Sequence, residues 1–370
     1  MSEIDGAISR LTIDLEAIQR NYRRLKAELG PETDCAAVVK ADAYGLGARH
    51  VAPALAAAGV RRFFVAQIEE GIALRSLLPN AELFVLNGLQ PGLEAEFERH
   101  ELIPVLNSLL EIELWANRAR SLGRALPAAI HLDTGMSRLG MPRGEIERLI
   151  EEPHRLDGIR LLLVMSHLAC SDEPEHEANQ RQLGLFQRCL PRLPAVPASL
   201  ANSSGIFLGP DYRFQLVRPG AALYGVNPVR NRSNPMEQVI VVEGKILQVR
   251  DVDRGTTVGY GATHRIERAH ARLATVGVGY ADGYLRSASG RGLAYLGNRR
   301  VRVVGRISMD LITIDVSEAT QEETQPGDWV ELIGPHLPVD EVADRAGTIG
   351  YEVLTSLGRR YRRRYVTSAG

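Results

Sequence analysis

The chain has 370 residues, of which 45% are hydrophobic and 24% are charged. This is enough material for two domains, or for one large barrel with an appendage. Its 44 basic residues balance 45 acidic ones, which leaves a net charge of -1 and predicts no nucleic-acid or membrane partner.

In the first two-thirds of the chain, short apolar runs alternate with longer amphipathic stretches, which is typical of repeated βα units. Candidate strands are residues 36–40, 63–66, 83–86, 103–106, 129–133, 162–167, 198–201 and 215–218. Apolar residues recur at three- and four-residue spacing in candidate helices 48–58, 69–78, 109–121, 144–151 and 175–190. Eight such units predict an α/β fold with an N-terminal (β/α)8 TIM-type barrel.

An open doubly wound sheet would give the same alternation. The barrel is favoured because the chemically suggestive residues all follow strand ends, which a barrel gathers on one face.

From about residue 237 the pattern changes to valine-rich strands broken by glycine turns, and helix signals become sparse. The candidate strands are residues 239–252, 256–261, 272–280, 293–296, 301–316 and 329–332. The segment 227–235, rich in Asn, Pro and Arg, suits a linker. We therefore predict a barrel domain over residues 1–235 and a mostly-β C-terminal domain over residues 236–370.

Three cysteines, Cys35, Cys170 and Cys189, are too few and too irregularly spaced for a disulfide framework or a zinc site. The N-terminus lacks a basic segment followed by an apolar one, and no apolar stretch is long enough to cross a bilayer. These features predict a cytoplasmic protein without a metal. The dense basic run at 359–365 has no basic recognition helix to accompany it, so we expect a solvated or subunit-contacting terminus.

Lys40 follows the apolar run 35–39, and a lysine at the end of a buried strand is a candidate for a chemical role. Burial disfavours the ammonium form and lowers the pKa, which leaves more of the free amine that forms a Schiff base with an aldehyde. The same pattern also suits a lysine that extends from a strand end into solvent.

Polar residues also follow the later strands. Arg138, after the fifth strand, is placed to meet a carboxylate, and the sixth strand ends at His167. The last two strands run into 202–205, Asn-Ser-Ser-Gly, and 218–221, Arg-Pro-Gly-Ala. Barrels commonly bind phosphate in these two loops, where small residues let backbone N–H groups approach it. Each segment alone suits an ordinary turn, but their occurrence together with Lys40 is a more specific sign of a binding site.

In the second domain, Tyr260, Tyr280 and Tyr351 each lie beside glycines. A tyrosine in this setting is often a packed strand residue with a bonded hydroxyl. The segment 305–310, Gly-Arg-Ile-Ser-Met-Asp, could likewise be structural.

The string Val-Val-Lys-Ala-Asp-Ala-Tyr-Gly-Leu-Gly around Lys40 resembles the pyridoxal-phosphate lysine motif of alanine racemases. The other segments resemble that family in its order, over nearly the whole chain and without a large insertion. The resemblance implies a fold-type III enzyme that binds pyridoxal 5'-phosphate and racemises alanine. It also implies a head-to-tail homodimer whose active sites contain residues of both chains.

The resemblance assigns the catalytic roles to Lys40, which also carries the cofactor, and to Tyr260 of the partner subunit. Racemisation removes a proton from one face of Cα and returns one to the opposite face, so two bases are needed. Lys40 would serve the D face and Tyr260 the L face. The substrate would be bound by Arg138, the Met309 backbone and Tyr280. The further cofactor-binding positions are Tyr44, His167, Asn202, Ser203, Arg218, Gly220, Ala221 and Tyr351.

Within that set, Arg218 would face the pyridine nitrogen, and His167 would link Arg218 to Tyr260. One position departs from the family. Many members carry a carbamylated lysine two residues before the Asp of the Asp-Thr-Gly-Met motif, whereas this chain has His131 there. A carbamate is thus excluded, and Arg138 must be oriented by His131 or by a bound anion; alternatively, the histidine only packs and hydrogen-bonds.

Other functions remain open. A broad-specificity amino-acid racemase would share the lysine and the tyrosine, although Tyr280 and Tyr351 look bulky enough to favour a small substrate. A decarboxylase of the same fold type would need a glutamate in place of Arg218. A non-catalytic carrier of pyridoxal phosphate would lack the β domain. The sequence leaves open whether racemisation supplies D-alanine for peptidoglycan or serves alanine catabolism.

Overall fold

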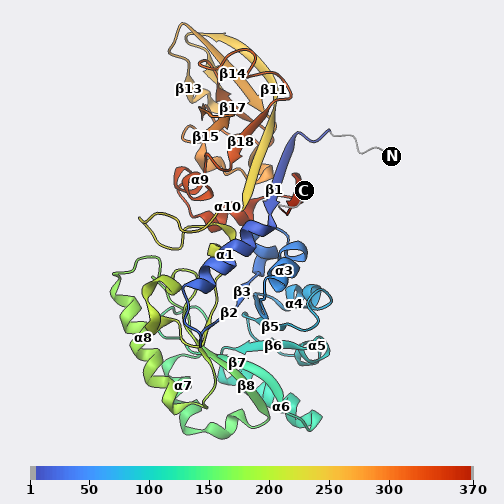
Figure 1. Ribbon diagram of the computed structural model, residues 1–370, viewed down its shortest axis with the longest axis vertical. Coiled ribbons are helices and arrows are strands. Elements are labelled where there is room, and N and C mark those ends of the chain that lie inside the picture. Colours follow the sequence, from blue (N-terminus) through green and yellow to red (C-terminus); the bar gives the residue numbers. More distant parts are fainter. Residues whose placement is uncertain (1–5, 368–370) are drawn as a thin grey trace. The chain divides into compact units, whose positions relative to one another are not determined.

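The computed structural model describes residues 6–367, which form two compact units. The barrel unit contains Ile18–Ala43 and Gly47–Met236. Among the described residues, the sheet unit contains 6–17, the short segment Tyr44–Leu46 and 237–367. The first described residues therefore belong to the same unit as the C-terminal part of the chain (Figure 1).

Parallel strands run through the barrel unit in chain order. One sheet has the order β3-β4-β5-β6-β7-β8-β9, and β10 pairs with β2. Ala36 alone separates β2 from β3, so these two pieces occupy one position in the ring. Between β9 and β10 the ring closes through a parallel bridge of Asn202 with Arg218 and a hydrogen bond of 2.9 Å from Arg218 N to Ala201 O. The strands are β2 (Asp34–Cys35), β3 (Ala37–Val38), β4 (Arg62–Val65), β5 (Glu82–Val85), β6 (Leu102–Leu106), β7 (Leu126–His131), β8 (Ile159–Met165), β9 (Ala198–Ser199) and β10 (Leu216–Val217). The predicted barrel is confirmed, and the open sheet is excluded.

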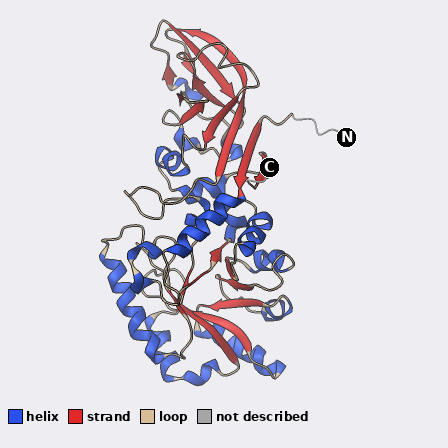
Figure 2. Cartoon of the chain, viewed as in Figure 1, coloured by secondary structure: helices blue, strands red, loops and turns tan. Residues whose placement is uncertain are grey.

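Helices surround these strands (Figure 2). They are α1 (Leu15–Ala27), α3 (Ala48–Ala57), α4 (Ile68–Arg75), α5 (Glu94–Arg99), α6 (Leu109–Leu122), α7 (Arg143–Glu151) and α8 (Glu177–Cys189). Helix α6 shows why the sequence folds so: Ser108 accepts a hydrogen bond from Glu111 N at its start, and Gly123 ends it with φ 63°. Its buried residues, with Ile112, Trp115 and Ala119 among them, recur at helical spacing. The five expected helices are present; α1 and α5 are additional.

The sheet unit is built on eight strands in the order β14-β17-β16-β15-β18-β11-β1-β19, with a further pairing of β14 with β11. All pairs are antiparallel except β1 with β19. The strands are β1 (Ser9–Asp14), β11 (Ile240–Asp253), β14 (His270–Val276), β15 (Leu293–Leu296), β16 (Arg299–Val303), β17 (Ile312–Asp315), β18 (Trp329–Ile333) and β19 (Arg362–Val366). A small hairpin joins β12 (Thr257–Val258) to β13 (His264–Arg265).

The structure corrects three expectations for this part of the chain. The expected strand 301–316 is two strands, β16 and β17, because Gly305 with φ 70° turns the chain between them. The strand expected over 256–261 ends at Val258, since Gly259 also has φ 70°. The expected strand 272–280 ends at Val276. Two helices, α9 (Val339–Ala346) and α10 (Gly350–Ser356), interrupt the strands, so the unit is mostly rather than entirely β.

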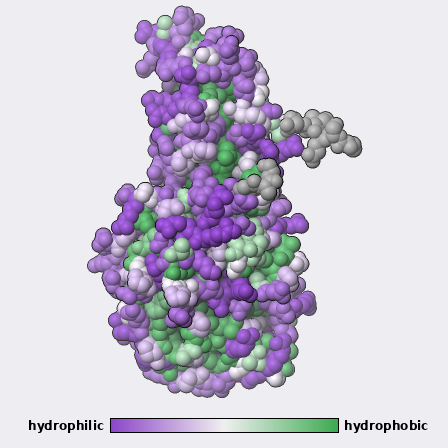
Figure 3. All heavy atoms as spheres, in the orientation of Figure 1, coloured by the Kyte–Doolittle hydropathy of each residue, from purple (hydrophilic) through white to green (hydrophobic). Residues whose placement is uncertain are grey.

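Hydrophilic side chains dominate the face of the sheet unit seen in Figure 3, whereas apolar ones gather over the lower part of the barrel unit in that view. Within residues 6–367, we find no helix with both the length and the apolar character needed to span a membrane.

Candidate active site

Lys40 lies at the carboxyl end of β3 and begins an unusual turn, α2 (Lys40–Tyr44). Residues 41–44 have φ between 53° and 56°, in the left-handed region, although none is glycine. Each such residue costs roughly 1–2 kcal/mol. Hydrogen bonds of the turn offset part of this cost, among them one of 2.7 Å from Ala48 N to the Asp42 carboxylate. The amine of Lys40 is thus presented by a backbone that the local sequence alone disfavours.

Five titratable side chains at the carboxyl ends of the barrel strands share one electrostatic environment: Lys40, His131, Arg138, His167 and Arg218. Burial lowers the pKa of Lys40, and the charge of Arg138 lowers it further. Burial also holds the pKa of His167 well below its usual range, followed by the charges of Arg218 and Arg138. Lys40 therefore keeps more free amine at neutral pH than an exposed lysine would.

Arg218 is the most buried of these cations, with 3% of its surface exposed. Its guanidinium donates to the Ser166 carbonyl at 2.6 Å and to the Ser199 hydroxyl, and it lies 3.5 Å from His167 Nδ1. Burial lowers the pKa of Arg218 to about 9, so the group remains a cation at neutral pH. Two neutral oxygen acceptors fix its direction without neutralising its charge.

Arg138 is exposed, and its guanidinium has neither a hydrogen bond nor an ion pair with any residue in 6–367. Its loop is shaped by Asp133, whose Oδ1 accepts from the backbone N–H groups of residues 135, 136 and 137 at 2.9, 2.9 and 3.1 Å. The structure therefore places a cation on a hydrogen-bonded loop, with its donors available to a carboxylate.

The loops after β9 and β10 meet at Ser203, which is buried. Its Oγ accepts from the N–H groups of Gly220 and Ala222 at 3.0 and 3.2 Å. Between them, the Ala221 N–H has no acceptor within the described residues. Asn202 shapes the first loop, since its Oδ1 accepts from Gly205 N and Ser171 Oγ, each at 2.9 Å. A buried, unpaired N–H beside a hydroxyl suits a phosphate.

His131, at the end of β7, is tied to Asn107. The distance between His131 Nδ1 and Asn107 Oδ1 is 2.8 Å, while Asn107 Nδ2 donates to the carbonyls of Val105 and Leu86 at 2.8 and 3.3 Å. Asn107 Oδ1 must therefore accept, and His131 Nδ1 must donate. Burial lowers the pKa of His131 to about 4, so the imidazole is neutral and its Nε2 carries a lone pair.

The remaining predicted site residues belong to the sheet unit. Tyr44 and Tyr351 make an edge-to-face contact with ring centroids 6.2 Å apart, and burial raises the pKa of Tyr44. Tyr260, Tyr280 and Met309 are instead 70%, 41% and 53% exposed. Large side chains this exposed favour a contact surface.

Tyr260 lines a cavity of about 470 Å³ together with Arg306, Ser308 and Leu311. The neighbouring Met309 carbonyl accepts from Ala281 N at 2.9 Å, next to Tyr280. The Met309 N–H donates to no residue in 6–367. The sheet unit thus brings Tyr260 close to Ser308, beside an unused backbone donor.

Gln182 is a site-supporting residue that sequence reasoning missed. It is 1% exposed on α8, and its Nε2 donates to the His167 carbonyl at 2.9 Å and to Thr134 Oγ1 at 3.3 Å. It thereby joins the loop that carries Arg138 to the one that follows β8. The available signal was its position on the buried stripe of α8, four residues before Phe186.

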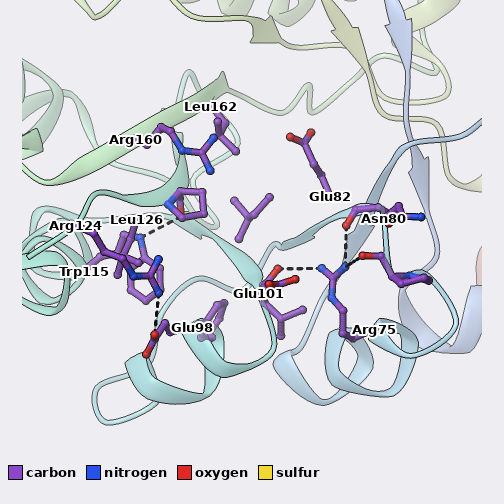
Figure 4. A pocket seen from close by; sticks show the side chains of 16 residues that line it. Arg75, Asn80, Glu82, Glu98, Glu101, Trp115, Arg124, Leu126, Arg160 and Leu162 are labelled. Atoms are coloured by element: carbon purple, nitrogen blue, oxygen red, sulfur yellow. Dashed lines mark hydrogen bonds and ion pairs between the residues drawn. The ribbon is translucent and has the colours of Figure 1, made fainter. Parts of the chain in front are cut away.

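A second cavity, of about 400 Å³, lies at the starts of β5, β6, β7 and β8, the opposite end of the barrel (Figure 4). Several of its charged side chains are bonded within the protein. Arg75 donates to the carbonyls of His100, Leu78 and Ala81, each at 3.0 Å, and Glu98 pairs with Arg124 at 2.8 Å. This arrangement is typical of a stabilising rather than a reactive barrel end.

At the carboxyl end of its closed parallel barrel, the protein combines a lysine of lowered pKa with loops suited to bind a phosphate. These features define a class of β/α-barrel proteins suited to bind an aldehyde that carries a phosphate. Residues 13–228 match the family model of the alanine racemase N-terminal domain, and residues 239–365 match that of the C-terminal domain. The chain belongs to the alanine racemase family.

Individual relatives agree with this assignment. The alanine racemase of Rhodospirillum rubrum is 53% identical over 366 residues, which cover 99% of this chain and 98% of that protein. A protein of Mesorhizobium japonicum named "Alanine racemase, catabolic" is 50% identical over 362 residues, 98% of this chain and 93% of that protein. The crystal structure of alanine racemase from Bartonella henselae, with covalently bound pyridoxal phosphate, matches with a TM-score of 0.93 and 45% identity. The match covers 98% of this chain and 100% of that one.

Proposed function

We propose that this protein is an isomerase that interconverts L-alanine and D-alanine with pyridoxal 5'-phosphate as its cofactor. The observation that carries the proposal is the lowered pKa of Lys40 within a cluster of cations, at the barrel end that also carries the Ser203 cradle. Membership of the alanine racemase family and the covalently bound cofactor of the Bartonella henselae protein support it.

The residues present fit the cofactor. Lys40 offers the amine for an aldehyde, and Ser203 with the Ala221 N–H offers donors for a phosphate. Tyr44, Asn202, Gly220 and Tyr351 would complete the phosphate site, while His167 and Arg218 would face the ring. When bound, pyridoxal phosphate supplies an aldehyde that joins to amines and a conjugated ring that accepts electron density from Cα.

Two bases would handle the α-proton. Lys40 Nζ would take or return it on the D face, and Tyr260 Oη of the partner subunit would do so on the L face. A phenol with a pKa near 10 is a weak base at neutral pH, so Tyr260 needs positive charge nearby. Arg218 would supply such a charge through His167, whose Nδ1 lies 3.5 Å from the Arg218 guanidinium.

Arg138 and the Met309 N–H would receive the substrate carboxylate, because each is an available donor within its own unit. Tyr280 would limit the space for the substrate side chain and so favour alanine over larger amino acids. A carboxylate held this way leaves Cα as the atom that meets the two bases.

The assembly, the domains and the compartment are part of the same proposal. We infer a homodimer with shared active sites, supported by the 70% exposure of Tyr260. We place the functional domains at residues 1–235 and 236–370. Their boundary lies in the gap between the two family matches, which end at 228 and begin at 239, although β1 and Tyr44–Leu46 belong to the sheet unit of the structure. We place the protein in the cytoplasm, where free thiols such as its three cysteines stay reduced.

The test is to purify the protein with pyridoxal phosphate and to follow α-proton exchange of L- and D-alanine, serine and lysine in D2O by NMR. We expect exchange with inversion of alanine, abolished by Lys40→Ala together with the Schiff-base absorbance. Tyr260→Phe should keep that absorbance and lose about 10²–10⁴-fold in racemisation, the usual contribution of a proton-transferring group. Cofactor binding without exchange of any amino acid would contradict the proposal, and full racemisation by Tyr260→Phe would remove the tyrosine from its role.

A further inference from the structure

The carboxylate of Glu70 joins two elements of the barrel. Glu70 lies in the first turn of α4, where its Oε2 accepts from the N–H groups of Ala66 and Gln67 at 2.7 and 3.1 Å. Its Oε1 accepts from Ala41 N at 2.6 Å. One oxygen thus caps the helix that follows β4, and the other holds the residue directly after Lys40.

The segment that receives this bond needs support from outside. Residues 41–44 are all left-handed and none is glycine, so an unsupported chain would leave this conformation. The bonds of Ala43 N to Val39 O and of Gly47 N to Asp42 O lie within residues 39–47. The bond from Ala41 N to Glu70 instead anchors the turn to the neighbouring strand position of the barrel.

We propose that Glu70 is a positioning residue for Lys40: its carboxylate holds the left-handed turn and thereby fixes where the lysine amine lies. This inference rests on the proposed function, because it assigns a purpose to the placement of Lys40. Glu70 touches neither substrate nor cofactor in this account and acts through the backbone of Ala41.

The charge of Glu70 has a second, separable effect. The charged and titratable groups that act on Lys40 are Arg138, His167 and Glu70. Arg138 lowers the pKa of Lys40 and Glu70 opposes it. Neutralising Glu70 should therefore lower the pKa of Lys40 further, which moves its deprotonation to lower pH.

A carboxylate suits this position better than an amide. Its two oxygens accept three N–H groups, whereas a glutamine would present one oxygen and an NH2 group that cannot accept. Glu70→Gln must consequently release either the helix cap or the turn. Glu69, the preceding residue, offers a matched control because it is exposed and makes no hydrogen bond with the described residues.

The first experiment compares full-length wild type, Glu70→Gln and Glu69→Gln by hydrogen–deuterium exchange and mass spectrometry, with and without bound pyridoxal phosphate. In Glu70→Gln we expect the peptide covering 36–48 to exchange at least about 10-fold faster, since a protecting acceptor is lost. Glu69→Gln should match the wild type. Unchanged exchange in Glu70→Gln would overturn the inference.

The second experiment labels Lys40 in the cofactor-free protein with acetic anhydride across a pH series. The midpoint of labelling against pH should move to lower pH in Glu70→Gln and stay in place in Glu69→Gln.

Glu70→Asp keeps the charge on a shorter side chain, so it should loosen the turn while holding the midpoint near that of the wild type. If Glu70→Gln does not fold, Glu70→Asp replaces it as the variant that tests the turn. A Lys40 midpoint equal in all four proteins would contradict the electrostatic part. Both readouts are independent of racemisation, so they stand or fall separately from the proposed function.

Discussion

The two ends of the barrel differ in how far their charged side chains are bonded within the protein. At the carboxyl end, the guanidinium of Arg138 has neither a hydrogen bond nor an ion pair with the described residues. At the amino end, the guanidinium of Arg75 donates to several backbone carbonyls, and Glu98 pairs with Arg124. An unneutralised cation is costly unless another group supplies the opposite charge. The contrast indicates that the carboxyl end is arranged for anionic groups that arrive from outside.

Replacing one arginine by methionine at each end tests this comparison. The larger effect on activity is expected for Arg138→Met. Because the exposed guanidinium has no partner in the protein, the free energy of unfolding should change by less than about 0.5 kcal/mol. The loss of a charge-assisted contact to the substrate carboxylate should raise KM and lower kcat/KM by about 10²-fold. Steady-state racemisation and urea denaturation measure the two quantities. A destabilised variant with an ordinary KM would place Arg138 among the structural cations.

Arg75→Met should do the reverse. The substitution keeps an apolar stem but leaves the carbonyls of Leu78, Ala81 and His100 without their donor. We expect the free energy of unfolding to fall by about 3 kcal/mol. The kcat/KM of the folded fraction should stay within about twofold of the wild type, since the cavity lies away from the site. A large loss of kcat/KM at unchanged stability would show that the amino end also takes part in function.

His131 provides the smallest and most specific effect. Its pKa is about 4 in the folded protein and about 6.5 when unfolded, so only the unfolded chain takes up the proton as pH falls between these values. Stability is therefore retained above pH 6.5 and lost toward pH 4, and we expect a loss of about 2 kcal/mol from this residue between pH 7 and pH 5.

His131→Gln can still donate to Asn107 but does not titrate in this range, so its urea denaturation should depend less on pH by that amount. A residual dependence should remain, because burial also lowers the pKa of His167. Parallel pH profiles for variant and wild type would show that His131 does not stay neutral in the fold.

Local sequence patterns were sufficient for the barrel and for much of its reactive end. Strand-end positions such as Lys40, Arg138 and Arg218 can be recognised because apolar runs mark the strands, and the barrel topology then brings the ends together. The same logic predicted the loops of Ser203 and Gly220, which the structure joins by a hydrogen bond.

Features that depend on distant partners were not predictable in this way. The turn after Lys40 contains Ala-Asp-Ala-Tyr, which gives little sign of four left-handed residues, because the bond from Ala41 to Glu70 spans 29 positions. Gln182 looks like an ordinary polar residue until its helix is placed against the barrel. The break at Gly305 was missed because the apolar residues on both sides read as one continuous strand.

The strand β1 has a consequence for how the protein is made. It alternates buried and half-buried residues and pairs with β11, with Leu11 opposite Val242. A ribosome releases β1 more than 200 residues before that neighbour exists, so the nascent chain carries a strand with unpaired backbone groups and the apolar residues Leu11 and Ile13 through the synthesis of the entire barrel. Completion of this sheet must also await the synthesis of β19 (Arg362–Val366), since that strand pairs with the other edge of β1. Such long-range pairing is expected to form late in folding.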